Sequence, residues 1–329
     1  MSVRTVRAGR LRRWSVLLLS SSLLAGCGLV SGSPMTDDVE PGSIGKGKPL
    51  EGAELTVTSK EFTEQIILGN IMGLAFQAAG ATVIDKTNIQ GTIGAREAVR
   101  TGAADAMYEY TGTGWITHLG HENPIPDSRK MYEAVKKEDA RNNVSWLPYS
   151  TMNNTYALAV TPKTQKKYGL RTLSDVAKLA KKDPKAVSVC VESEFAARND
   201  GLPGMSKKYG LKLSASQIKK MSAGVIYTQV KGGSCTFGEV YTTDGRIKAL
   251  NLRTLEDDRK FFPLYNAAPE IYTPTLKKYP EIAKILDPIT KKLSNSVAQE
   301  LNGKVDVDGE DPHQVALDWM VKEGFIKKA

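Results

Sequence analysis

The sequence predicts an α/β protein with two lobes. Strand and helix patterns alternate between residues 55 and 108, and the alternation restarts after a polar helix that ends near residue 142. From residue 261 onward, the pattern changes to helices punctuated by proline. Alternating strands and helices usually build parallel sheets. We therefore expect each lobe to contain a central, mostly parallel sheet flanked by helices, with the C-terminal helices returning to the first lobe.

The first lobe begins with a strand at Leu55 to Ser59, which leads into a helix from Phe62 to Ala79 that Gly80 closes. The next elements follow in the same alternation. They are a strand at Thr82 to Lys86, a short helix at Arg96 to Thr101, a strand at Ala104 to Tyr108 and a polar helix at Ser128 to Asn142.

The second lobe is predicted from a new run of short apolar segments with helices between them. Its strands are expected at Tyr156 to Val160, Val187 to Val191 and Thr236 to Tyr241, and its helices at Leu173 to Ala180 and Ser214 to Met221. The final helix of the chain has Asp311 as its N-cap, Pro312 at its first position and Gly324 as its stop signal.

The N-terminus has the pattern of an export signal. Five arginines precede an apolar run from Trp14 to Leu24 that is too short to span a bilayer. The following segment, Leu24 to Cys27 (LAGC), is typical of a lipoprotein, so we expect a signal peptide over 1–26 and a lipid on Cys27. An ordinary cleaved signal is the alternative. We expect residues 27–51, rich in Gly, Ser and Pro, to be a flexible tether that holds the protein on the outer face of the cell membrane.

Composition argues against several other classes. The formal net charge of +9 falls to +4 without residues 1–26, which contain five arginines and no acids, and no basic stripe with interleaved aromatics suggests nucleic-acid binding. Three histidines without metal-ligand spacing argue against a metal site, and no cofactor is expected. No nucleophile motif suggests an enzyme. The sequence leaves open whether Cys190 and Cys235 form a disulfide.

Four tyrosines lie in polar segments that are typical of loops and strand ends: Tyr110, Tyr156, Tyr241 and Tyr265. Tyrosine ring faces attract cations, including quaternary ammonium groups that cannot donate hydrogen bonds. If the four side chains converge, they form a cage for such a group. The alternative is that strand tyrosines such as Tyr156 and Tyr241 simply pack against a sheet.

Several segments together resemble the substrate-binding lipoproteins of compatible-solute ABC importers, the glycine betaine/carnitine/choline-binding family. The resemblance covers nearly all of the chain after the tether. The matching segments are SKEFTEQIILGN (59–70), EYTGT (109–113), NNTYAL (153–158), FAARNDG (195–201), YTTDGRI (241–247) and LEDDRKFFPLY (255–265).

The resemblance implies a type II periplasmic-binding-protein-like fold, whose two lobes are joined by a hinge and close on the ligand. The first lobe would comprise 52–155 and 263–329, and the second 156–262, with the hinge near 153–157 and 258–265. The resemblance also implies a cation cage and a separate site for a ligand carboxylate. The cage would contain Tyr110, Tyr156, Tyr241, Tyr265 and Asn154, with Tyr132 ranked lower, and the carboxylate site would contain Lys60, Thr113 and Arg198.

Glycine betaine is the ligand expected from this set of residues. A ligand without a carboxylate would leave Lys60 and Arg198 desolvated and unpaired. Thr113 stands where some choline-specific relatives place an acid, which argues against a dedicated choline site, and Asn154 stands where some relatives carry Asp. A choline-binding or carnitine-binding protein of the same importer class is the alternative, and a structural lipoprotein or an extracellular hydrolase is a remote one. The implied partners are an ABC permease and its ATPase, and the chain is expected to be monomeric.

Overall fold

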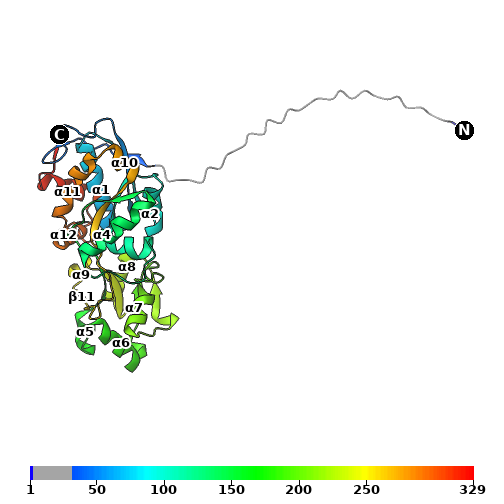
Figure 1. The fold of residues 1–329 in the computed structure, drawn as a ribbon. Helices are drawn as coiled ribbons and strands as arrows, with labels where there is room; N and C mark the ends of the chain where they lie inside the picture. The colour runs from blue at the N-terminus through cyan, green and yellow to red at the C-terminus, as the bar shows by residue number, and fades with distance from the viewer. Residues whose placement is uncertain (3–31) are drawn as a thin grey trace. The chain divides into compact units, whose positions relative to one another are not determined.

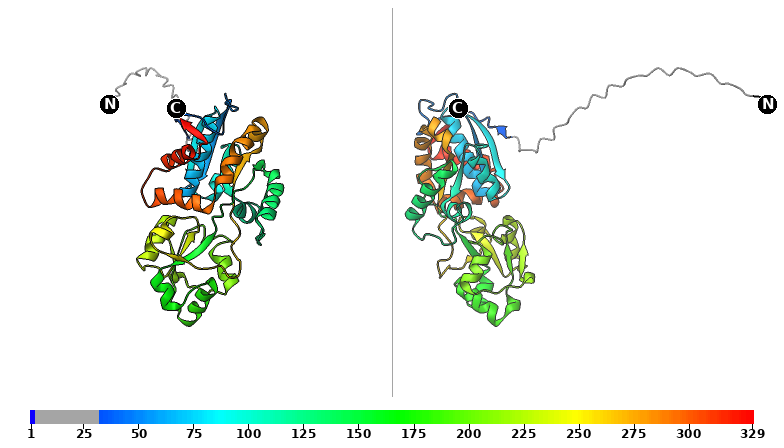
Figure 2. Two further views of the ribbon diagram at one scale, coloured as in Figure 1. Left: turned by 90° about the vertical axis from the view of Figure 1, so that its left-hand side faces the viewer. Right: turned by 45° about the vertical axis from the view of Figure 1, so that its right-hand side comes forward.

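The structure describes residues 1–2 and 32–329, and two large sheets form its centre (Figure 1). In the computed structural model, one large sheet has six strands in the order β1-β4-β3-β5-β12-β6, and the other has five in the order β11-β7-β10-β8-β9. A third sheet consists of β2 and β13. We call the parts built around the two large sheets the first and the second lobe; Figure 2 shows them as two bodies, each with strands surrounded by helices. Residues Gly32–Ala329 form one compact unit. The predicted signal peptide beyond Ser2 and the predicted lipidation site Cys27 lie outside the described residues.

The first lobe combines segments from both ends of the described chain. Its strands are β1 (Ser33–Pro34), β2 (Val39–Pro41), β3 (Glu54–Lys60), β4 (Thr82–Ile89), β5 (Ala106–Tyr110), β6 (Val144–Trp146), β12 (Ala267–Tyr272) and β13 (Ile326–Lys328). Its helices are α1 (Thr63–Ala78), α2 (Thr92–Arg100), α3 (Thr111–Thr113), a π-helical turn (Gly114–His118), α4 (Ser128–Asp139), a 3₁₀ turn (Ala140–Asn142), α10 (Thr273–Lys278), α11 (Glu281–Lys292), α12 (Asn295–Asp306) and α13 (Pro312–Lys322).

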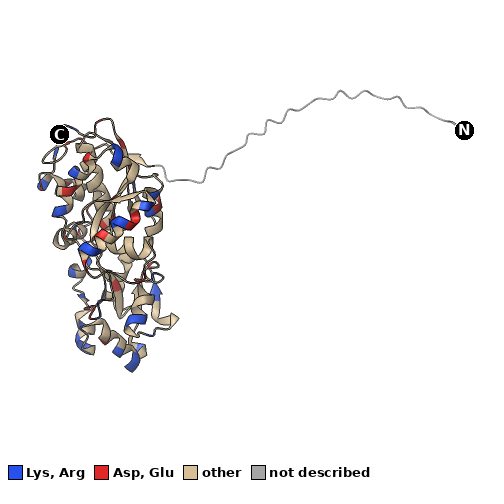
Figure 3. Ribbon diagram, in the orientation of Figure 1, with Lys and Arg blue, Asp and Glu red and all other residues tan. Residues whose placement is uncertain are grey.

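The second lobe comes from one continuous segment. Its strands are β7 (Tyr156–Val160), β8 (Val189–Val191), β9 (Ile218–Lys220), β10 (Phe237–Tyr241) and β11 (Arg253–Thr254). Its helices are α5 (Pro162–Tyr168), α6 (Leu173–Lys182), α7 (Leu202–Tyr209), α8 (Ala223–Lys231) and α9 (Arg246–Ala249), with 3₁₀ turns at Pro184–Ala186 and Ala215–Gln217. Basic and acidic residues are mixed on the first lobe, whereas the helices of the second lobe, such as α5 and α7, carry mostly lysines (Figure 3).

The fold class expected from the sequence is confirmed, although both sheets are mixed. Parallel pairing joins β3 to β4 and β5 in the first lobe, and β8 to β9 and β10 in the second. The strands next to the lobe connections, β12 and β7, run antiparallel to their neighbours. This arrangement places the carboxyl ends of the parallel strands of each sheet at one edge.

Helix α1 is the central helix of the first lobe. Almost all of its side chains are buried, including Phe76 and Met72, because α12 and α13 cover the side that the sheet does not. Gly69 allows close packing of α1 on the sheet, since a Cβ atom there would lie 2.6 Å from the Cγ2 atom of Thr87. The N-terminus of α1 is therefore held firmly at the edge of the sheet where the cavity described below lies.

The two connections between the lobes run side by side. Asn153 forms an isolated β-bridge with Asn266. The Asn154 N–H donates to the carbonyl of Tyr265 at 3.1 Å, and the Tyr265 N–H donates to the Asn153 side chain at 2.7 Å. The lobe limits 52–155 plus 263–329 and 156–262 stay a prediction, and the pairing of β1 with β4 and of β2 with β13 adds residues 33–51 to the first lobe.

Two predictions of local structure are wrong. Residues 33–51 are not a flexible tether: β2 pairs with β13, β1 pairs with β4, and Leu50 and Ile44 are buried. Of the Gly and Pro residues that suggested a linker, Pro34 and Pro41 lie in β1 and β2, and Gly47 and Pro49 lie in exposed turns. The helix expected at Ser214 to Met221 is a 3₁₀ turn followed by the edge strand β9.

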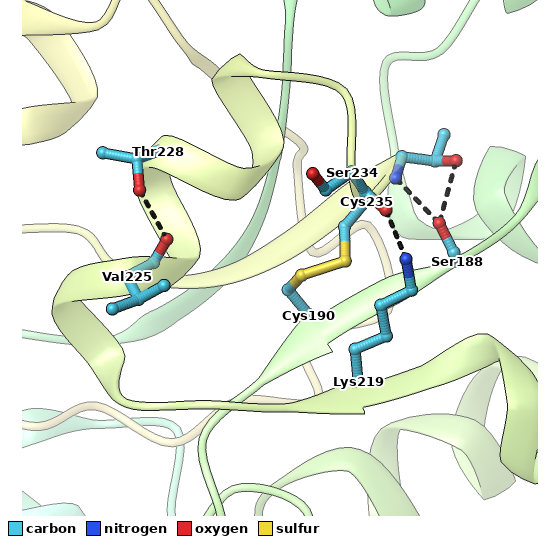
Figure 4. The surroundings of a disulfide bond; sticks show 8 residues. Ser188, Cys190, Lys219, Val225, Thr228, Ser234 and Cys235 are labelled. Atoms are coloured by element: carbon cyan, nitrogen blue, oxygen red, sulfur yellow. Dashed lines mark hydrogen bonds between the residues drawn. A yellow bond between two sulfur atoms is a disulfide. The ribbon is translucent and has the colours of Figure 1, made fainter.

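A disulfide joins Cys190 of β8 to Cys235, which precedes β10 (Figure 4). Both cysteines are buried, and the Lys219 ammonium donates to the carbonyl of Ser234 beside the bond. The bond links the two parallel strands of the second lobe that end at the cavity. No helix within 32–329 is long and apolar enough to cross a bilayer.

Candidate functional site

A cavity of about 280 Å³ is lined by residues of both lobes. Lys60 and Tyr110 line it from the ends of β3 and β5, and Glu192 and Tyr241 line it from the ends of β8 and β10. Ligand sites of α/β proteins commonly lie at the carboxyl ends of parallel strands. The volume is close to the lower limit for sites that bind small organic molecules, about 300 Å³, so the cavity is suited to a small solute.

The four predicted tyrosines all line this cavity. Tyr156 of β7 and Tyr241 of β10 are directly opposite each other in the antiparallel pair, with ring centroids 5.4 Å apart. The ring of Tyr265 meets that of Tyr156 edge-on at 5.3 Å. Tyr110 comes from the first lobe, at the end of β5. The register of two strands and one lobe connection thus brings together residues that are far apart in the sequence.

Phe62 connects the tyrosines of the two lobes. It is the residue before α1, and its ring is nearly parallel to those of Tyr110 and Tyr241, with centroid distances of 6.3 and 5.4 Å. We call these five side chains the aromatic cluster: Tyr110, Tyr156, Tyr241, Tyr265 and Phe62. Their ring faces supply the π-electron density that attracts a cation.

Lys60 lines the cavity, but its charge already has a partner. Its ammonium lies 2.7 Å from Oε1 of Glu109, and Nε2 of His118 lies 3.0 Å from Oε2 of the same carboxylate. Burial alone would raise the pKa of Glu109, but Lys60 and His118 lower that pKa to about 2. Lys60 also lies 5.2 Å from the centroid of the Tyr110 ring.

Arg198 is paired in the same way. Its guanidinium donates two hydrogen bonds to Asp200, at 2.8 and 2.6 Å, and the Tyr265 hydroxyl donates to Oδ2 of Asp200 at 2.7 Å. The guanidinium lies 5.9 Å from the centroid of the Tyr156 ring. Arg198 therefore contacts two rings of the aromatic cluster, Tyr265 through Asp200 and Tyr156 through a cation–π contact.

A third ion pair, which the sequence analysis did not predict, lines another part of the cavity. Arg246 is paired with Asp244 at 2.5 Å and with Asp306 of α12 at 3.2 Å. We call Lys60, Arg198, Arg246 and the carboxylates that bind them the three ion pairs. The expectation that Lys60 and Arg198 are unpaired in the absence of a ligand carboxylate is thus wrong for this structure, because Glu109 and Asp200 compensate them.

The remaining predicted residues differ in position. Thr113 and Asn154 line the cavity and are buried. Tyr132 does not line it: its ring packs against Tyr149, and its hydroxyl donates to the carbonyl of Trp146. Tyr132 lies on the buried face of α4, which packs under the edge of the first sheet, so its assignment to the cage is wrong.

Several acidic residues also border the cavity. Glu194 accepts hydrogen bonds from the N–H and the hydroxyl of Thr92, both at 2.7 Å, which links the second lobe to the first. Burial, together with the nearby carboxylates of Glu194 and Glu61, raises the pKa of Glu192 to about 7. Behind it, burial raises the pKa of Glu239 to about 8; Oε2 of Glu239 accepts the N–H of Glu192 at 2.7 Å.

Sequence reasoning missed Phe62, Glu64, Thr243 and the third ion pair, although most of them lie inside the segments that carry the family resemblance. Phe62 and Glu64 belong to SKEFTEQ, and Thr243, Asp244 and Arg246 belong to YTTDGRI. Their location in these segments could have identified them as candidate site residues. Asn302 and Asp306 of α12, which also line the cavity, lie outside every quoted segment and gave no signal.

Comparison with known proteins agrees with this geometry. The family model described as the substrate binding domain of ABC-type glycine betaine transport system matches residues 53–322. A glycine-betaine-binding protein of Pseudomonas aeruginosa is 37% identical over 271 residues, which cover 81% of this chain and 86% of that protein. The carnitine transport binding protein OpuCC of Listeria monocytogenes is 33% identical, with 95% of this chain and 96% of the relative covered.

Solved structures give the same result. The apo structure of YehZ from Escherichia coli has a TM-score of 0.63 at 30% identity, covering 83% of this chain and all of that one. The structure of a glycine betaine/carnitine/choline ABC transporter protein has a TM-score of 0.68 at 28% identity, with 82% and 99% covered.

The two-lobed fold with a cavity between the lobes defines an extracytoplasmic substrate-binding protein of the ABC-importer type, which is a transport protein class and not an enzyme family. The chain belongs to the family of substrate-binding domains of ABC-type glycine betaine transport systems.

Proposed function

We propose that this protein captures a quaternary ammonium compatible solute, most specifically glycine betaine, and delivers it to an ABC permease for osmoprotection. The observation that carries the proposal is the aromatic cluster: four tyrosines and Phe62 from both lobes border one small cavity. A desolvated cation gains about 0.5 to 2 kcal/mol from each ring face that it contacts. Several rings together give useful affinity without any hydrogen bond to the ammonium group.

Glycine betaine is favoured over choline by the basic residues beside the cluster. Lys60, Arg198 and Thr113 line the same cavity as the rings. Arg198 is bound to Asp200 through Nε and Nη2, and among residues 32–329 the ion-pair partner of its Nη1 atom is Glu194, at 3.7 Å. We propose that this nitrogen contacts the ligand carboxylate. The glycine-betaine-binding relative at 37% identity supports the same cargo.

Choline and carnitine remain the competing cargoes. A ligand without a carboxylate, such as choline, does not leave the basic side chains of the cavity unpaired, because carboxylates of the protein already neutralise them. The cost of desolvating these side chains therefore does not argue against choline. The similarity to a carnitine transport binding protein favours a somewhat larger betaine. A calorimetric comparison of the three ligands therefore decides the cargo.

The proposed context is an importer at the cell surface. We propose that a lipid on Cys27 anchors the chain, that the chain acts as a monomer, and that a permease and its ATPase supply the energy for import. The predicted lipoprotein signal supports the anchor. Mass spectrometry of the protein purified from membranes tests it, because a diacylglyceryl group on Cys27 changes the mass of the N-terminal peptide.

The test of the cargo is isothermal titration calorimetry of the full chain in a non-ionic detergent. Glycine betaine, choline, carnitine and proline are titrated in turn, with a sugar as the control. We expect tight binding of glycine betaine and weaker binding of choline. The proposal is wrong if no quaternary ammonium compound binds.

A further inference from the structure

Glu64 is a buried carboxylate in the wall of the cavity. It is the second residue of α1 and is 4% exposed. Its Oε1 atom accepts hydrogen bonds from the Tyr110 hydroxyl at 2.6 Å and from Nδ2 of Asn154 at 2.8 Å. Its Oε2 atom accepts from the Thr243 hydroxyl at 2.5 Å and from Nδ2 of Asn302 at 3.1 Å. Four donors on two oxygens match the acceptor capacity of an ionised carboxylate.

These bonds cross from one lobe to the other. Tyr110 and Asn302 belong to the first lobe, Asn154 to a lobe connection, and Thr243 follows β10 in the second lobe. Asn302 also donates to the carbonyl of Thr243 at 3.0 Å, so the contact is doubled. Glu64 is thus ordered by groups on both sides of the cavity, and one of them is the hydroxyl of a ring in the aromatic cluster.

The charge of Glu64 is not balanced within the described part of the chain. The carboxylates bound to Lys60, Arg198 and Arg246 are other residues, and Glu64 takes part in none of the ion pairs of residues 32–329. Burial raises the pKa of Glu64 above its ordinary value even though the four hydrogen bonds oppose the rise, as expected for a carboxylate without a positive partner. A buried carboxylate without a positive partner is costly. The adjoining cavity is the place where a cation can supply one.

A second atom in the wall of the cavity also lacks a partner among residues 32–329. Oδ1 of Asn154 is buried and has no hydrogen-bond partner among the described residues. Asn154 lines the cavity, and its side-chain Nδ2 group donates a hydrogen bond to Glu64. An unsatisfied acceptor beside an uncompensated carboxylate makes this part of the wall electronegative, which is unfavourable for an uncharged or anionic group and favourable for a cation.

We propose that Glu64 is a specificity-determining residue, the counter-charge that makes the site select a cationic head group over an uncharged group of the same shape. The aromatic cluster supplies shape and ring faces, and Glu64 supplies the fixed negative charge. The inference rests on the proposed function, because it concerns the same cavity and the same class of ligand. It goes beyond that function by assigning charge selectivity to one residue of α1.

The test compares glycine betaine with 3,3-dimethylbutanoate, in which carbon replaces the ammonium nitrogen. The full chain in non-ionic detergent is titrated with both, as wild type and as Glu64→Gln. We expect Glu64→Gln to weaken glycine betaine binding about 10-fold to 100-fold, as for truncated charge partners in other interfaces. Binding of 3,3-dimethylbutanoate should stay the same or become tighter. Equal losses for both ligands would show that Glu64 only holds the lobes together, and would overturn the inference.

Thr92→Val is the matched variant for a purely structural role. It removes the hydroxyl hydrogen bond from Thr92 of the first lobe to Glu194 of the second and leaves Glu64 and its four donors in place, so it should weaken both ligands by the same factor. Glu97→Gln, on the exposed face of α2, removes a surface carboxylate and should change neither affinity. If Glu64→Gln does not fold, Glu64→Asp replaces it. The shorter side chain withdraws the charge from the cavity, so the preference for glycine betaine should fall at least threefold; an unchanged preference would overturn the inference.

The wild-type titration separates the two proposals. If neither glycine betaine nor choline binds, the proposed function fails and the inference fails with it. If only choline binds, the same comparison is made with choline and 3,3-dimethylbutan-1-ol, its uncharged counterpart. If a quaternary ammonium ligand binds but Glu64→Gln keeps the full preference for it, the proposed function stands and the inference about Glu64 is wrong.

Discussion

The aromatic cluster and the three ion pairs line the same cavity but differ in what they leave for a ligand. A ring that packs against another ring keeps its ability to attract a cation at an open face. By contrast, Lys60, Arg198 and Arg246 are already bound to carboxylates of the protein. A ligand carboxylate must therefore compete with, or add to, these pairs. We infer that the rings determine affinity for the ammonium head and that the charged residues determine which ligand is preferred.

Arg198→Ala is expected to have the largest effect, because it removes a charge whose partner Asp200 is buried. Truncating one member of a buried ion pair commonly costs about 2 to 5 kcal/mol of binding free energy, roughly 30-fold or more. Loss of the Arg198–Asp200 bonds also frees the Tyr265 hydroxyl from a fixed partner. Choline affinity should therefore fall, and glycine betaine affinity should fall further. Calorimetry with both ligands measures the difference.

The result that decides the role of Arg198 is the difference between the losses of affinity for glycine betaine and for choline. An additional loss for glycine betaine reports a contact between Arg198 and the ligand carboxylate. Equal losses would mean that Arg198 only positions the rings. Arg129→Ala, at an exposed position on α4, is the control and should leave both affinities unchanged.

Tyr241→Ala tests the aromatic side of the comparison. Removal of one ring face should weaken every quaternary ammonium ligand about 3-fold to 30-fold. Tyr241→Phe should stay within about twofold of wild type, since the ring face and not the hydroxyl attracts the cation. Tyr168→Ala, on α5 outside the cavity, controls for loss of an unrelated tyrosine. Retained affinity in Tyr241→Ala would remove this residue from the cage.

Phe62→Leu sharpens the same comparison with a smaller expected effect. Leucine keeps much of the apolar volume but removes the stacking on Tyr110 and Tyr241. Each aromatic pair contributes about 0.5 to 1.5 kcal/mol beyond its burial, so affinity should fall about 2-fold to 10-fold. The ratio of glycine betaine to choline affinity should not change, because no charge is altered. A changed ratio would show that Phe62 also affects selectivity.

The tyrosines of the cage could be predicted from the sequence because each lies in a distinctive segment that resembles the family. Phe62 and Glu64 lie in such a segment too, but a phenylalanine before a helix is typical of core packing, and an acid in the first turn is typical of helix-dipole stabilisation. Their importance depends on Tyr241 and Thr243, which approach from the second lobe. A local pattern contains no information about such an approach.

Two of the ion-pair contacts could not be predicted from the sequence for a related reason. Lys60 and Glu109 are 49 positions apart and meet because β3 and β5 are neighbours in one sheet. Arg246 and Asp306 meet only because α12 returns to the cavity after the second crossing of the chain. The packed segment at 33–51 was mistaken for a tether because Gly and Pro are as frequent in tight surface turns as in linkers.

The pH dependence of binding is the smallest expected effect and tests only the charged residues near the cavity. Burial raises the pKa of Glu192 to about 7 and that of Glu239 to about 8, and Glu194, Glu61 and Arg198 are the charged groups that influence Glu192 from nearby. As the pH rises from about 6 to 9, both carboxyls ionise and add negative charge at the cavity wall. Choline carries a net positive charge and glycine betaine carries none. Choline affinity should therefore rise about twofold relative to glycine betaine.

The same ionisation has the opposite effect on stability. Because both pKa values are raised on folding, the folded protein binds more protons than the unfolded chain above about pH 4.5, and the free energy of unfolding falls as the pH rises through 7 and 8. Glu239→Gln, which cannot ionise, should make both the unfolding free energy and the choline preference less dependent on pH. Denaturant unfolding and calorimetry at pH 6 and pH 9 measure the two effects. A choline preference that stays constant in the wild type would show that the ligand does not sense the charge of Glu192, and that the selectivity arises elsewhere in the cavity.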